Sequence, residues 1–97
     1  MPRVMFTVTY TIEAEKQAEH QELMRRLKKI YAEKGLEYYV FRNKANEFTE
    51  ATIYADQDAF EEADDLMEEE TTSEYINRVN SIAHNIRYET LTELDVD

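Results

Sequence analysis

The segment from Leu36 to Ala55 is a strand, a polar turn and a second strand, and it limits the folds open to this chain. The turn spans Asn43 to Glu47, where Asn43 or Asn46 can adopt the unusual backbone angles that such turns need. A long amphipathic helix is predicted on either side of this hairpin, and one more strand toward each end of the chain. The order is therefore β-α-β-β-α-β, which predicts a single α+β domain over residues 1–97 with the helices on one face of the sheet.

The first strand, Arg3 to Ile12, presents two different faces. Its even-numbered residues are apolar and should lie under the helices: Val4, Phe6, Val8, Tyr10 and Ile12. Its odd-numbered residues include Thr7 and Thr9 and carry no charge, which is unusual for a face in bulk water. We therefore expect this second face to be covered in part by something else.

The first helix is predicted over Glu13 to Lys34. Its buried stripe is Leu23, Leu27, Ile30 and Tyr31. Gly35 follows at the position where a helix often ends in a left-handed residue. His20 lies on the same stripe without an evident acidic or histidine partner, and we interpret it as a packing histidine that is partly buried.

The second helical region is interrupted at Thr71 to Ser73, so it is predicted to be two helices or one kinked helix. Asp56 or Asp58 can cap its start, and Thr71 with Glu74 forms a second capping box. The inner face of the first part is predicted to be Phe60, Ala63, Leu66 and Met67. His84 is expected near the helix end, and residues 86–94 form the last strand.

Strand alternation in the hairpin predicts which residues face away from the helices. In the second hairpin strand the small residues Ala51 and Ala55, together with Ile53, suit close packing under a helix. The opposite face would then gather Tyr39, Phe41, Glu50, Thr52 and Tyr54, together with Thr7 and Thr9. An aromatic face of this kind usually marks an interface or a pocket.

Composition excludes several classes of function. With 22 acidic residues against 11 Lys+Arg, the formal charge of −11 disfavours binding to nucleic acid or to an anionic membrane. The acidic run over residues 61–70 could be a cation site, but we interpret it as a solvated helix face. The chain has no Cys, which excludes disulfides and thiolate chemistry. No metal site, cofactor, signal peptide or membrane span is expected, and a cytoplasmic location follows by default.

The strand–helix entry YTIEAEKQAEHQEL, the segment GLEYYVFRN and the segment TIYADQDAFEEA resemble the dimeric α+β barrel superfamily, in its antibiotic-biosynthesis monooxygenase-like branch. This resemblance implies a ferredoxin-like domain whose sheets pack face to face in a homodimer, with a pocket between each sheet and its helices. Enzymes of that family often carry Trp where Tyr54 stands and His where Ala63 stands. Haem-degrading relatives carry Asn where this chain has Thr7, which argues against haem degradation.

Two functions from different classes remain open. In the first, the protein binds or oxidises an aromatic or polyketide-like molecule without a cofactor, as the resemblance implies. Glu50 would be the candidate catalytic residue and would move a proton, and the ligand-binding residues would be Thr7, Thr9, Tyr39, Phe41, Thr52 and Tyr54. In the second, the protein is a non-catalytic homodimer in which the same side chains fill the interface. An alternative for Glu50 is an ion pair with Arg42 across the hairpin.

Overall fold

The computed structural model describes residues 2–63 and 69–96 and confirms the β-α-β-β-α-β order. The strands are β1 (Val4–Ile12), β2 (Glu37–Arg42), β3 (Glu47–Tyr54) and β4 (Ala83–Thr92); the helices are α1 (Gln17–Glu33), α2 (Gln57–Glu62) and α4 (Glu70–Ile82), with a short 3-10 turn, η1 (Ala14–Lys16), before α1. The strands form one antiparallel sheet in the order β2-β3-β1-β4. This is the ferredoxin-like arrangement that the sequence predicts.

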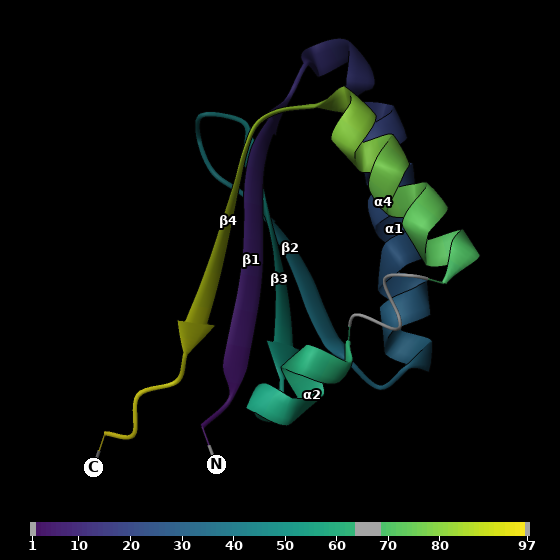
Figure 1. Cartoon of the computed structure of the whole chain (residues 1–97). Helices are drawn as coiled ribbons and strands as arrows, with labels where there is room; N and C mark the ends of the chain where they lie inside the picture. The colour runs from purple at the N-terminus through teal and green to yellow at the C-terminus, as the bar shows by residue number, and fades with distance from the viewer. Residues whose placement is uncertain (1, 64–68, 97) are drawn as a thin grey trace.

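The two long helices lie together on one face of the sheet, while α2 lies at the end of β3 (Figure 1). The core forms between this face and the helices. It consists of Tyr10, Ile12, Leu23, Met24, Leu27, Tyr31, Tyr38, Phe48, Val79 and Ile82. None of the described helices covers the other face of the sheet, which we call the outer face (Figure 1).

The register between β1 and β3 decides which side chains of β3 enter the core. Val8 lies opposite Glu50 and Phe6 opposite Thr52, and residues directly opposite each other in a ladder share a face. Glu50 and Thr52 therefore face the helices, and the prediction that Ala51 and Ile53 would do so is wrong. The physical reason is that the even-numbered face of β3 also carries Phe48 and Tyr54, whose large rings are buried.

Among the described residues, the region after the hairpin contains α2 and α4. The predicted interruption at Thr71 to Ser73 is wrong, because these residues lie within α4. Asp56 caps α2, since its carboxylate accepts a hydrogen bond from the Ala59 N–H at 2.8 Å. The capping box at Thr71 is wrong, because α4 already begins at Glu70 and Thr71 lies inside its first turn. The predicted core residues Leu66 and Met67 lie outside the described residues.

The last strand begins earlier than the sequence suggested. α4 ends at Ile82 and β4 starts at Ala83, so His84 belongs to the strand and not to the helix end. Its Nε2 lies 3.5 Å from a carboxylate oxygen of Glu13 at the surface. Within residues 2–63 and 69–96, no helix has both the length and the apolar character to cross a membrane.

Gly35 ends α1 in the left-handed region, with φ of +76°, as predicted. A Cβ added there would meet no atom within 4 Å, so a substitution meets backbone strain and no clash. Asn46, with φ of 60°, serves the hairpin turn in the same way.

We expect Gly35→Ala to lower the free energy of unfolding by about 1 kcal/mol in urea titrations, because a Cβ disfavours this conformation. Gly35→Asn is the matched control, since asparagine tolerates left-handed angles and should recover part of the loss. Equal losses in the two variants would contradict a backbone origin.

Candidate functional site

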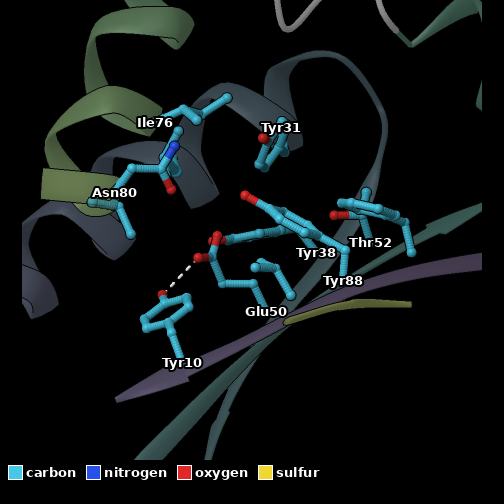
Figure 2. A pocket seen from close by; sticks show the side chains of 12 residues that line it. Tyr10, Tyr31, Tyr38, Glu50, Thr52, Ile76, Asn80 and Tyr88 are labelled. Atoms are coloured by element: carbon cyan, nitrogen blue, oxygen red, sulfur yellow. Dashed lines mark hydrogen bonds between the residues drawn. The ribbon is translucent and has the colours of Figure 1, made fainter. Parts of the chain in front are cut away.

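An internal cavity of about 230 Å³ lies between the sheet and the helices (Figure 2). Its walls are mostly aliphatic and aromatic, with a few polar groups among them. They are Phe6, Val8, Tyr10, Leu27, Tyr31, Tyr38, Glu50, Thr52, Ile76, Val79, Asn80 and Tyr88. Asn80 of α4 and Tyr88 of β4 are both exposed, so they form the rim between that helix and the edge strand. An apolar cavity with a few convergent polar groups has the general character of a small-molecule site.

Among the residues that the structure describes, Glu50 is the one carboxylate that lines this cavity. Tyr10 donates a hydrogen bond to its Oε2 at 2.6 Å, and Tyr38 donates one to its Oε1 at 2.5 Å. The carboxylate extends from the sheet between these two rings (Figure 2). Each carboxylate oxygen accepts more than one hydrogen bond, so a ligand donor can still approach Glu50.

His20 extends this network on the other side of Tyr10. The Nε2 of His20 lies 2.7 Å from the Tyr10 hydroxyl oxygen, and the two rings meet edge to face with centroids 5.4 Å apart. His20 is only 2% exposed and also packs on Phe48. The interpretation as a packing histidine is correct, but His20 is fully buried where partial burial was expected, and its hydrogen bond to Tyr10 was not predicted. One hydrogen-bonded chain therefore runs from His20 through Tyr10 and Glu50 to Tyr38.

Burial dominates the electrostatics of this hydrogen-bonded network of side chains. Loss of hydration raises the pKa of Glu50 above its ordinary value, and the hydrogen bonds from Tyr10 and Tyr38 only partly oppose this. Burial and the nearby Glu50 charge raise the pKa of both tyrosines, so their hydroxyls remain protonated donors. Burial lowers the pKa of His20 to about 4, so its imidazole is neutral at pH 7.

The structure separates the predicted site residues into two groups on opposite faces of the sheet. Glu50 and Thr52 line the cavity, which corrects their predicted position on the outer face. Tyr54 is also on the helix side, where it is 1% exposed and packs edge to face on Phe60 at 5.3 Å, outside the cavity wall. The alternative prediction of an ion pair between Glu50 and Arg42 is wrong. Arg42 lies opposite Phe48, and the two carboxylate oxygens of Glu50 accept hydrogen bonds from tyrosine hydroxyls instead.

The second group stays on the outer face, where the alternation predicted it. Tyr39 and Phe41 are 42% and 59% exposed, with ring centroids 6.4 Å apart. The Thr9 hydroxyl lies 3.0 Å from that of Thr49, and Thr7 donates to the backbone oxygen of Glu89 at 3.4 Å. These four residues do not line the cavity.

Sequence reasoning missed the tyrosines that surround Glu50. Tyr10 and Tyr31 were predicted as core residues of their elements, which is correct, and Tyr38 is buried in the same core. A buried tyrosine hydroxyl needs a hydrogen-bond partner, so several tyrosines on inner faces are themselves a sign of a polar group in the core. In the part of the chain that the structure describes, no three carboxylate, thiol or imidazole side chains converge as metal ligands would.

Comparison with known proteins shows the fold and leaves the activity to be inferred. No family model and no curated protein matches the chain. Among solved structures, it resembles SnoaB, a cofactor-independent oxygenase from Streptomyces nogalater, with a TM-score of 0.78 and 16% identity, over 99% of this chain and 97% of that one. It also resembles a conserved protein from Methanosarcina mazei, with a TM-score of 0.82 and 13% identity, over 97% and 95% of the two chains.

A third similar structure is a Deinococcus radiodurans protein proposed to be an antibiotic biosynthesis monooxygenase, with a TM-score of 0.75 and 13% identity over 97% of this chain and 95% of that one. The predicted resemblance to the antibiotic-biosynthesis monooxygenase-like proteins is therefore confirmed as a likeness of fold.

We expect the stability difference between Glu50→Gln and the unmodified protein to depend on pH. A carboxyl whose folded-state pKa is raised binds more protons in the folded than in the unfolded state, so its contribution to stability falls as pH rises from its unfolded value through its folded value. Glutamine lacks this term. The variant should therefore gain stability relative to Glu50 between about pH 4 and pH 7, by about 1.4 kcal/mol per unit of the raised pKa.

Urea titrations of both proteins across this range measure the difference. His20 has the opposite sign, because its folded pKa is depressed and its contribution is lost as pH falls from about 6.5 toward 4. This term is common to both proteins and cancels to first order. A difference that shrinks with rising pH would mean that the tyrosine hydrogen bonds outweigh burial.

Proposed function

We propose that this chain is a monooxygenase-like protein that binds a small aromatic or polyketide-like molecule in the cavity beside Glu50. The observation that carries the proposal is a carboxylate, hydrogen-bonded by two tyrosines, on the wall of an otherwise apolar cavity. A filled core has no need for such a group, since burying a carboxylate costs stability unless it is compensated.

The size and lining of the cavity favour an aromatic ligand of few rings. An apolar cavity of about 150 Å³ accommodates benzene, so about 230 Å³ suits a molecule somewhat larger. Phe6, Tyr31 and Tyr88 supply ring surfaces in the cavity wall. Glu50 would accept a hydrogen bond from a phenol or enol hydroxyl of the ligand and so fix its orientation.

The proposed chemistry starts with a proton transfer from the ligand to Glu50. The raised pKa of this carboxyl makes it a stronger base than an exposed glutamate. The resulting phenolate or enolate is electron-rich and can reduce dioxygen, which is the oxidant. A carbon bearing two hydrogens becomes a carbonyl with one oxygen atom, and the other oxygen leaves as water. The fold shared with a cofactor-independent oxygenase supports this reaction class.

We further propose that the protein is a homodimer that pairs through the outer face. Tyr39, Phe41 and Leu91 expose 42%, 59% and 39% of their surface there, on the same face of the sheet as the uncharged threonines of β1. Exposed aromatic patches of this kind commonly mark interfaces. Because the cavity lies on the opposite side of the sheet, a filled dimer interface and an occupied cavity are compatible. The purely structural homodimer would be the conclusion if no aromatic ligand enters.

The cavity is tested with 1-naphthol and naphthalene, which differ only in a hydroxyl. We expect the protein to bind 1-naphthol about tenfold more tightly in NMR titrations, because a hydrogen bond to a charged group contributes about 1.5 kcal/mol or more. Glu50→Gln should reduce this preference while still binding naphthalene. Val8→Phe, which fills the cavity, should weaken both probes. Equal affinities of the unmodified protein for the two probes would contradict recognition by Glu50.

The dimer is tested by light scattering, where we expect about twice the chain mass of 11.6 kDa. Phe41→Asp should shift the protein to the monomer, because a charge on the outer face would be buried on pairing. Tyr88→Asp is the matched control, since Tyr88 is 62% exposed but pairs with Val8 on the helix side. A folded monomer at micromolar concentration in the unmodified protein would overturn the proposal.

A further inference from the structure

His20 has no part in the chemistry proposed for the cavity, yet it is hydrogen-bonded to the group that holds Glu50. It also lines a second hollow, an outer groove of about 400 Å³ at the hairpin side of the molecule. The groove is formed by Gln17, His20, Gln21, Met24, Val40, Phe41, Arg42 and Phe48. Tyr10 and Glu50 line the internal cavity. The hydrogen bonds from Glu50 through Tyr10 to His20 therefore connect the wall of the cavity with the wall of the groove.

The Tyr10 hydroxyl has one hydrogen and two strong neighbours, which leaves two consistent arrangements. When Glu50 is ionised, Tyr10 donates to Glu50 and accepts from the Nε2–H of His20. When Glu50 is protonated and donates to Tyr10, the Tyr10 hydrogen turns to His20, whose proton must then be on Nδ1. The protonation of Glu50 and the tautomer of His20 are therefore coupled through one hydroxyl.

We propose that Glu50, Tyr10 and His20 form a proton relay between the internal cavity and the outer groove. The relay rests on the proposed function only for the origin of the proton, which would be the ligand hydroxyl. The hydrogen-bonded chain itself is a property of the protein without ligand.

Each step of the relay moves one proton and no electrons. To return Glu50 to its ionised form, protonated Glu50 gives its proton to the Tyr10 oxygen, while Tyr10 gives its own proton to Nε2 of His20. The imidazole then releases the Nδ1 proton to water in the groove. The result is ionised Glu50 and neutral His20 with its proton on Nε2, which is the first arrangement. Proton uptake from the groove is the reverse sequence.

The surroundings favour the branch through Tyr10 over the branch through Tyr38. Among the described residues, the hydrogen-bond partner of the Tyr38 hydroxyl beyond Glu50 is the Met24 sulfur, at 3.4 Å, which is a weak acceptor and holds no exchangeable proton. Tyr31 is the other titratable group close to Glu50 on the helix side, while Tyr88 lines the cavity from β4 and α4 contributes the neutral Asn80. In the groove, Arg42 is a charged side chain that lines the wall together with His20. Burial disfavours a lasting imidazolium, because it lowers the pKa of His20.

The test is the tautomer of His20 in the ligand-free protein, followed by ¹⁵N NMR of the imidazole while ¹³C NMR reports the Glu50 carboxyl. Because burial raises the pKa of Glu50 and holds that of His20 to about 4, Glu50 should take up its proton while His20 is neutral. We expect the His20 proton to move from Nε2 to Nδ1 at the same pH midpoint as Glu50 titrates.

Two variants separate the relay from ordinary burial. Tyr10→Phe removes the bridging hydroxyl without changing the ring, and His20 should then keep one tautomer while Glu50 still titrates. Tyr38→Phe removes the other hydroxyl from Glu50 and should keep the coupled change. An unmodified protein in which Glu50 titrates without a change at His20 would overturn the relay. So would a Glu50 that stays ionised until His20 itself protonates. Neither result depends on naphthol binding, so failure of the relay and failure of the proposed function are distinguishable.

Discussion

The register between β1 and β3 is the constraint on which the rest of the site depends. By placing Val8 opposite Glu50, it turns the carboxylate toward the helices and brings it between Tyr10 and Tyr38. Because side chains alternate along a strand, a shift of one residue would move Glu50 to the outer face and both tyrosine contacts would be lost. The large rings of Phe48 and Tyr54 fix this register, since the same shift would expose them.

Much of the fold could be predicted because its determinants are local. The alternation of β1, the apolar stripe of α1 and the backbone needs of Gly35 and Asn46 can all be recognised within a few residues of sequence. The faces of β3 could not be recognised in this way. One face offers small and apolar residues and the other mixes aromatics with Glu50, so local polarity favoured the wrong side. Whether Glu50 can be buried on the inner face depends on the hydrogen bonds from Tyr10 of β1 and Tyr38 of β2. The sequence of β3 alone does not contain these partners.

The partner of His20 shows the same limit at longer range. Its helical position predicted burial correctly, but the contact with Tyr10 requires that α1 cross β1 at a particular height. The separation of the predicted site into an inner and an outer group has a similar origin. Thr7, Thr9, Tyr39 and Phe41 were assigned by alternation within strands whose inner faces were plainly apolar, and their placement on the outer face was correct. The prediction of the two faces was reversed only for β3, whose inner face could not be recognised from the polarity of its residues.

The place where the cavity opens has a consequence for the exchange of its contents. Asn80 and Tyr88, which form the rim, come from α4 and from β4, and β4 is an edge strand of the sheet. A small separation between a helix and an edge strand leaves the pairing of the central strands β1 and β3 intact, and local openings of this kind need less free energy than global unfolding. A guest molecule can therefore enter and leave while the folded sheet persists.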